Sequence, residues 1–137
     1  MSIGNWFQIN GKTYDVKVIS IVESANILYS DKTGRTMSVG ARMVLDPLGT
    51  FIGHNVTVMR DGSNLADYDR LYNELIKPRY DGMMVKVVHD QTTIEYEAYV
   101  SAAEREIERI DGLGKKVYWK EMKINIVPME AWILPNE

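Results

Sequence analysis

Hydrophobic and polar residues alternate most regularly in the stretch from Thr92 to Pro128. Apolar side chains occupy every second position of two runs, which are Ile94, Tyr96, Ala98 and Val100 on the first and Met122, Ile124 and Ile126 on the second. A period of two residues is typical of a strand that buries one face. Residues 111–114, with two glycines, separate the runs. The sequence therefore predicts a long antiparallel hairpin.

The middle of this hairpin is strongly charged. Residues 104–111 are nearly all Glu, Arg or Asp, with Ile107 and Ile110 between them. A short helix is an alternative, since Glu and Arg favour that state, but the strand patterns on both sides favour one continuous ribbon. Its charges suit a projecting surface that pairs with other subunits and discourages indiscriminate edge pairing. The apolar parity changes between Trp119 and Met122, which indicates a bulge or a strand that leaves one sheet for another.

The amino-terminal half also follows strand patterns. Asn10-Gly11 predicts a tight turn that joins strands over residues 6–9 and 14–22. The pattern loosens after residue 22, and residues 30–36 are rich in turn formers, which predicts an exposed loop. Two further strands, over residues 37–45 and 50–60, are expected to pair through a turn at Asp46-Pro47-Leu48-Gly49.

One helix is predicted between two more strand segments. Ser63 or Asn64 can cap it, Asp67 lies in the capping-box position, and Pro78 ends it. Its apolar stripe consists of Leu65, Tyr68, Leu71, Tyr72 and Leu75. A strand over residues 83–89 follows. The order predicts a mainly β (α+β) fold, an antiparallel β-sandwich or open barrel with one flanking helix and a long projecting hairpin, in a single domain of residues 1–137.

Composition narrows the function classes. The 137 residues include 16 basic and 19 acidic side chains, so the net charge of −3 does not favour nucleic-acid binding. There is no cysteine, which excludes disulfides, thiolate zinc sites and cysteine nucleophiles. The amino terminus lacks a basic segment followed by an apolar run, and no window reaches the length of a membrane span. We expect a soluble protein folded in the cytoplasm.

Reactive constellations are not evident in the sequence. His54 and His89 lie in different predicted strands, and ordinary structural roles are expected for both. Glu104, Glu106 and Glu108 alternate with arginines, as on a mixed-charge surface. Neither a nucleophile elbow nor a phosphate-binding loop occurs. We therefore expect a protein that is not an enzyme and takes neither cofactor nor metal.

The sequence contains several short patterns, which are Trp6-x-x-Ile-Asn-Gly-Lys-x-Tyr-x-Val, Gly49-Thr50-Phe51-x-Gly, Tyr68-Asp69-x-Leu71-Tyr72-x-x-Leu75-x-x-Pro78, Ala98-Tyr99-Val100-Ser101, and Val117-Tyr118-Trp119 with Pro128-Met129. Together they resemble small structural tail proteins of tailed phages and prophages of Gram-positive bacteria. The resemblance implies a tail-tube-like domain in a virion tail, assembled in the host cytoplasm. It implies a homo-oligomeric ring in the tail tube, baseplate or tail tip, bound to other tail proteins, without membrane or specific nucleic-acid binding.

The resemblance makes the long hairpin, the loop of residues 31–36 and the chain ends the candidate assembly elements. The candidate interface residues are Arg105, Glu106, Ile107, Glu108, Arg109, Ile110, Lys116, Arg35, Trp6 and Trp132. Trp119 is expected in the core, whereas Trp6 and Trp132 fit a core or an interface equally. An alternative is a small β-sandwich that binds a carbohydrate or peptide in host recognition. A small hydrolase has almost no support.

Overall fold

The computed structural model describes residues 7–36, 40–62, 64–114 and 116–135, which form a mainly β fold. The strands are β1 (Phe7–Ile9), β2 (Val16–Tyr29), β3 (Gly34–Arg35), β4 (Met43–Val44), β5 (Pro47–Arg60), β6 (Met83–His89), β7 (Thr92–Glu104), β8 (Ile107–Asp111), β9 (Lys116–Trp119) and β10 (Met122–Pro128). Six strands form one antiparallel sheet in the order β1-β6-β7-β10-β5-β2. This confirms the predicted fold class, and the sheet stays open because its edge strands do not pair.

The core lies on one face of this sheet. Alternate residues of β5 and β10 are buried, among them Val56, Val58, Ile124 and Ile126. Helix α1 (Leu65–Leu75) covers them with Tyr68, Leu71 and Leu75, which are also buried. The period-two and helical patterns of the sequence thus meet in one apolar layer.

Helix α1 forms as predicted. The side chain of Asn64 accepts a hydrogen bond from the backbone N–H of Asp67 at 3.2 Å, which satisfies one of the free donors of the first turn. The Asp67 carboxylate accepts a second bond from the backbone N–H of Asp15 at 2.8 Å. The helix start is therefore tied to the chain segment that leads into β2.

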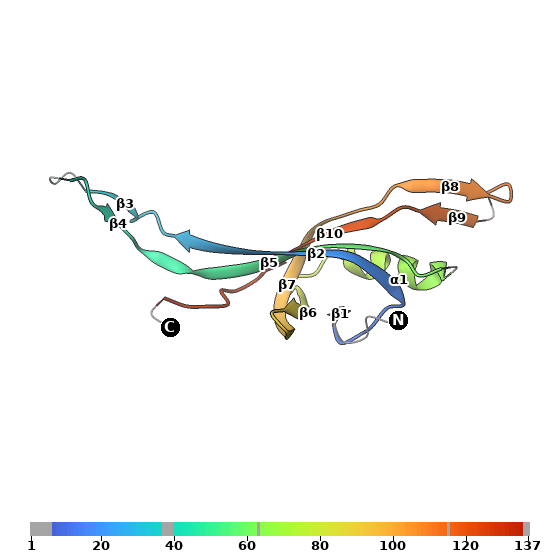
Figure 1. Cartoon of the computed structure of the whole chain (residues 1–137), viewed down its shortest axis with the longest axis horizontal. Helices are drawn as coiled ribbons and strands as arrows, with labels where there is room; N and C mark the ends of the chain where they lie inside the picture. The colour runs from blue at the N-terminus through green and yellow to red at the C-terminus, as the bar shows by residue number, and fades with distance from the viewer. Residues whose placement is uncertain (1–6, 37–39, 63, 115, 136–137) are drawn as a thin grey trace.

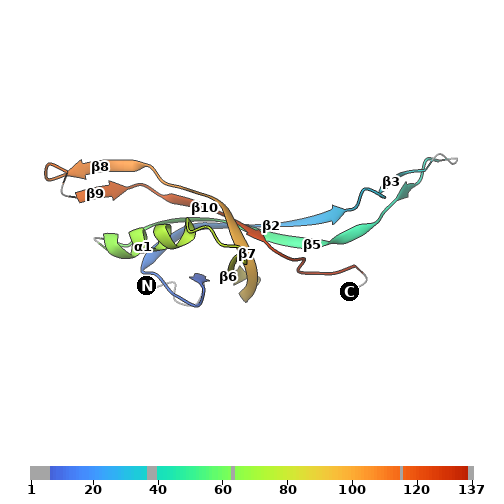
Figure 2. The ribbon, with the colours of Figure 1, turned by 180° about the vertical axis from the view of Figure 1, so that it is seen from behind.

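Two long arms extend from the core in opposite directions (Figure 1). The apolar arm comprises the outer parts of β2 and β5 with β3 and β4, residues 27–36 and 40–50. The charged arm comprises β8, β9 and the turn between them, residues 107–114 and 116–119. Seen from behind, the charged arm runs above α1, and the apolar arm reaches beyond the core on the other side (Figure 2).

The predicted long hairpin is confirmed. β7 pairs with β10, and β8 pairs with β9, so residues 107–111 are extended and not helical. The strands break at residues 105–106 and 120–121, where the parity change between Trp119 and Met122 had predicted an irregularity. A further register shift lies at Asn125.

The predicted amino-terminal hairpin is wrong in its strand pairing. Asn10 and Gly11 do form a tight turn with positive φ, and Ile9 and Lys12 bond across it. However, β1 pairs with β6, while β2 pairs with β5. The turn is held against β6 by two hydrogen bonds. The backbone N–H of Asn10 donates to the carbonyl oxygen of Met84, and the side-chain oxygen of Asn10 accepts from the Met84 N–H.

The turn expected at residues 46–49 is also wrong. β5 begins at Pro47 and pairs with β2, which itself runs without a break to Tyr29. Proline suits the first position of a strand, where no backbone donor is needed. Residues 30–36 are not wholly loop, since β3 pairs with β4. The part of the predicted strand 37–45 at residues 37–39 lies outside the described residues.

The carboxyl-terminal tail docks at the base of the apolar arm. The Trp132 N–H donates to the carbonyl oxygen of Thr50 at 2.8 Å, and the Thr50 N–H donates to that of Ile133 at 2.8 Å. Gly49 allows this close approach, because a Cβ at that position would lie 2.7 Å from the Cβ of Ala131.

Candidate assembly surfaces

The base of the charged arm is fixed to the helix by Arg105. Its guanidinium lies 3.9 Å from the ring centres of both Tyr72 and Trp119, and it donates to a carboxylate oxygen of Asp69 at 2.8 Å. Only 14% of the side chain is exposed. Arg105 therefore stabilises its own chain, and a role at an interface stays a prediction for this residue.

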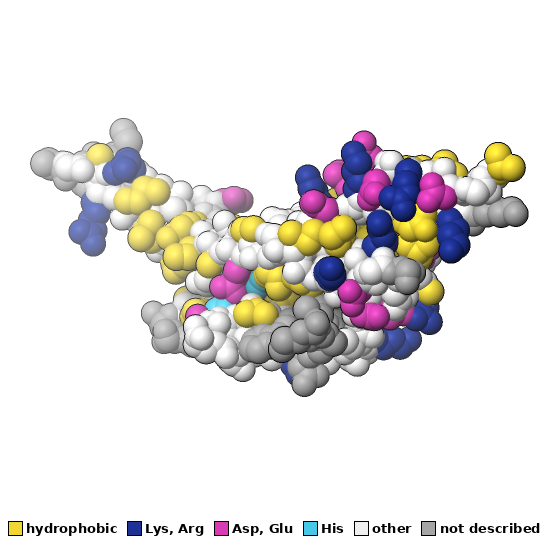
Figure 3. All heavy atoms as spheres, turned by 45° about the vertical axis from the view of Figure 1, so that its right-hand side comes forward, with side chains coloured by type: hydrophobic (Ala, Val, Ile, Leu, Met, Phe, Trp, Pro, Cys, Tyr) yellow, Lys and Arg dark blue, Asp and Glu magenta, His cyan; other side chains and the backbone are white. Residues whose placement is uncertain are grey.

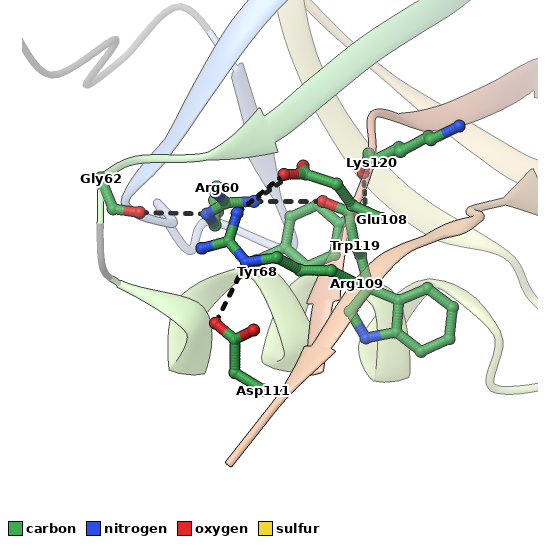
Figure 4. Close-up of polar contacts among 8 residues, drawn as sticks. All are labelled: Arg60, Gly62, Tyr68, Glu108, Arg109, Asp111, Trp119 and Lys120. Carbon is green, nitrogen blue, oxygen red and sulfur yellow. Dashed lines mark hydrogen bonds and ion pairs between the residues drawn. The ribbon is translucent and has the colours of Figure 1, made fainter. Parts of the chain in front are cut away.

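A second arginine joins the arm to the end of β5. Arg60 points toward the Glu108 carboxylate and the Trp119 carbonyl oxygen, at 3.5 Å and 3.3 Å (Figure 4). On the helix side, the Tyr68 hydroxyl donates to the carbonyl oxygen of Lys120 at 2.7 Å. Burial raises the pKa of Tyr68 to about 12, so the hydroxyl keeps its proton at neutral pH. The arm therefore leaves the core from a rigid base.

The outer part of the charged arm is exposed. Ile107 and Ile110 are about half exposed, while Arg109 bonds the neighbouring carboxylates of Glu108 and Asp111. Glu106 and Lys116 are also exposed among the predicted interface residues. Charges of both signs gather on this side of the molecule (Figure 3). The arm thus offers a polar surface with two accessible isoleucines.

The remaining predicted interface residues lie far from the charged arm. Arg35 is in β3 near the tip of the apolar arm, where it donates to the carbonyl oxygen of Ala41 at 3.4 Å. Trp132 is in the docked tail, 44% exposed, with its ring edge toward His89. Trp6 lies outside the described residues. Trp119 packs against the core, as expected.

One exposed apolar surface, on the apolar arm, was not predicted from the sequence. The apolar arm carries seven large apolar side chains that are 40% to 58% exposed: Ile27, Leu28, Tyr29, Met43, Val44, Leu45 and Leu48. Because Ile27, Leu28 and Tyr29 are consecutive in a strand, they project from both faces of the arm. The signal available in the sequence was this unbroken apolar run beside a polar turn.

Within the chain, these side chains have little cover. The arm is a two-stranded ribbon at this point, and the tail docks only near its base, at Thr50. Together, the seven half-exposed side chains leave on the order of 500 Å² of apolar surface open over the two faces of the arm. Two-stranded ribbons of this kind are also marginally stable when isolated.

A second feature missed in the sequence is a cluster of one carboxylate and two histidines. A single Glu23 oxygen lies 3.1 Å from Nε2 of His54 and 2.6 Å from Nδ1 of His89. The Tyr96 hydroxyl lies 2.7 Å from Nδ1 of His54. Glu23 belongs to the edge strand β2, whereas His89 ends β6 near the opposite edge, so the cluster exists because the sheet curls.

The electrostatics of the cluster follow from burial and mutual bonding. Burial lowers the pKa of His54, which is almost completely inaccessible to solvent. The hydrogen bond that His89 donates to the Glu23 carboxylate raises the pKa of His89. Burial alone would raise the pKa of Glu23, but its bonds with His89 and His54 together bring it below the ordinary range. His54 is thus a neutral core residue, and Glu23 joins it to His89 across the curled sheet.

In the described part of the chain, no group of three or more His, Asp or Glu side chains is placed to hold a metal ion. No helix among the described residues is long and apolar enough to span a membrane.

Comparisons with known proteins add no identity. A scan of the sequence against models of protein families finds no match, and a search of curated proteins finds no relative.

Proposed function

We propose that this protein is a non-enzymatic structural subunit that assembles with copies of itself through its arms, as part of a phage or prophage tail. The observation that carries the proposal is the apolar arm, which exposes seven large apolar side chains on a ribbon with little cover of its own. The projecting ribbon adds no packing to the hydrophobic core. A neighbouring subunit that covers the ribbon removes this apolar surface from water and supplies the missing packing.

The positions of the arms support a head-to-tail contact. The two arms differ in chemistry and leave the core in opposite directions, so one subunit presents different surfaces at its two ends (Figure 1). A repeated contact between two different surfaces generates a ring when the rotation closes, and a helical array when it does not. Both arrangements fit a tail tube or baseplate, as the sequence resemblance implies.

The proposal is tested by sedimentation velocity over a concentration series. The wild-type protein should associate as its concentration rises. Leu45→Glu with Leu48→Glu should stay monomeric, since both side chains lie on the exposed arm and a buried, unpaired carboxylate opposes association. Ile76→Glu is the matched control, because Ile76 is 49% exposed at the end of α1, outside both arms. A wild-type protein that remains monomeric at every concentration would contradict the proposal.

A further inference from the structure

The outer face of the sheet, opposite the core, has an unusual composition beside the apolar arm. The uncharged face comprises the outward residues of β2 over 20–26, β5 over 51–57, β10 over 125–127 and β7 over 99–102. The strand register places these residues in rows across the four strands, as in the row of Val22, Asn55 and Asn125. Inward neighbours such as Val56 and Ile124 are buried in the core. None of the outward positions in this face carries a charge.

The same sheet shows what a solvated outer face looks like. Over β6 and the outer part of β7, the outward positions include Lys86, Glu95 and Glu97, with Lys86 paired opposite Glu95. At the other boundary of the uncharged face, Lys123 pairs opposite Glu104. Charges therefore border the face on both sides and are missing within it. Charge depletion of this kind distinguishes the centre of an interface from the rest of a protein surface.

The shape of the uncharged face also indicates an occupant. Small side chains, such as Ser24 and Gly53, leave a shallow groove of about 470 Å³ beside Phe51 and Tyr99. Large apolar side chains fit over small ones, as they do between layers of a core. The face itself exposes few large apolar residues, so its occupant must supply the large side chains that fill the groove. The apolar arm carries such side chains.

We propose that the uncharged face binds the apolar arm of a second copy of the chain. This inference rests on the proposed function and names its contact. The face carries no charge, and on the arm the half-buried Asp46 between Leu45 and Leu48 already accepts a hydrogen bond from Ser30, so the contact adds little desolvation of ions. The polar side chains of the face, Asn26 and Asn55, can bond backbone groups of the incoming ribbon, whose outer strand edges are unpaired.

The other surfaces described above suit the arm less well. The charged arm presents Glu106, Arg109 and Lys116, and the sheet over β6 presents Lys86 and Glu95; an apolar ribbon would bury some of these charges unpaired. The area is also adequate. The arm exposes on the order of 500 Å² of apolar surface over its two faces, compared with the roughly 800 Å² that each partner buries in a standard interface. Backbone and polar contacts along the ribbon supply the rest.

Engineered cysteines test the contact directly, because the natural sequence has none. Single variants Leu45→Cys and Leu48→Cys mark the arm, and Val22→Cys, Ser24→Cys and Asn55→Cys mark the face. Each arm variant, lengthened by a tag that raises its mass, is mixed with each face variant and treated with a mild oxidant, and the mixed dimer and the two kinds of dimer between like variants are quantified as separate bands on a non-reducing gel. Disulfides form only when Cα atoms approach within about 7 Å, so the products report proximity. Thr92→Cys, exposed at the start of β7 outside the face, is the matched control.

At least one mixture of arm and face variants should give about tenfold more mixed dimer than the same arm variant mixed with Thr92→Cys. Dimers formed mainly between two arm cysteines would overturn the inference, because the arms would then bind each other. An oligomer that gives no dimer between arm and face would overturn it as well, and would leave the proposed function standing. If sedimentation shows only monomers, both the inference and the proposed function fail.

Discussion

Replacing Arg105 by alanine tests how the charged arm is attached to the core. The guanidinium lies between Tyr72 and Trp119, 3.9 Å from each ring centre, and bonds Asp69 at 2.8 Å. Alanine removes these contacts and also the packing of the aliphatic part of the side chain. The rings that remain would face the space that the arginine filled.

The expected loss can be estimated from the contacts. Two cation–π contacts with a mostly buried guanidinium contribute about 1–2 kcal/mol. The ion pair adds only about 0.5–1 kcal/mol, because the Asp69 side chain is 49% exposed and solvent screens it. Arg105→Ala should therefore lower the free energy of unfolding by about 2–3 kcal/mol.

Urea unfolding followed by tryptophan fluorescence measures this loss. Arg105→Lys should lose about half as much, because lysine keeps the charge but not the planar group that stacks between two rings. Arg109→Ala is the control, since the Arg109 side chain is 50% exposed and should cost less than about 1 kcal/mol. If Arg105→Ala stays within about 0.5 kcal/mol of wild type, the attachment described here is wrong.

The remaining predictions concern the histidine cluster and one glycine. The pKa of His54 is lowered, so its contribution to stability is lost as the pH falls below 6.5. The pKa of Glu23 is also lowered, so its contribution is lost as the pH falls below 4.5. The pKa of His89 is raised, so its contribution is lost as the pH rises above 6.5. Glu23→Gln should therefore flatten the pH profile of urea unfolding below 4.5 and above 6.5, and an unchanged profile would contradict the cluster. Gly82→Ala should lose about 2–3 kcal/mol, because φ is 71° and a Cβ would lie 2.5 Å from a carbonyl oxygen of β7. Gly34→Ala, which meets nothing within 4 Å, should cost far less in the same assay.

Local patterns predicted the elements whose stability is local. Helix α1 follows from its cap at Asn64, its apolar stripe and Pro78, all within one short stretch. The long hairpin follows from alternation on both sides of a glycine-containing turn, and its extended middle was expected for the same reason. The candidate interface residues on the charged arm could be named from the sequence because they lie in this hairpin.

Strand partners could not be predicted in the same way. Asn10-Gly11 specifies a turn, but the pairing of β1 with β6 depends on bonds to Met84, 74 residues away from Asn10. The cluster of Glu23 with His54 and His89 joins residues 31 and 66 positions apart, and it forms because the sheet curls. Tertiary structure decides such contacts, and propensity carries no information about them.

The apolar arm escaped prediction for a different reason. Ile27, Leu28 and Tyr29 are consecutive, so they show no alternation, and the proline and glycine of residues 47–49 suggested a turn where β5 begins. A strand without a buried face has no period-two pattern within its own chain. If a second copy covers both faces, the missing pattern is explained by the assembly.

The most direct test of assembly through the apolar arm is sedimentation velocity of the wild-type protein beside Leu45→Glu with Leu48→Glu, at matched concentrations. We expect the wild type to form species larger than a monomer and the double variant to sediment as a folded monomer. Equal sedimentation of the two proteins, whether both associate or both stay monomeric, would contradict it.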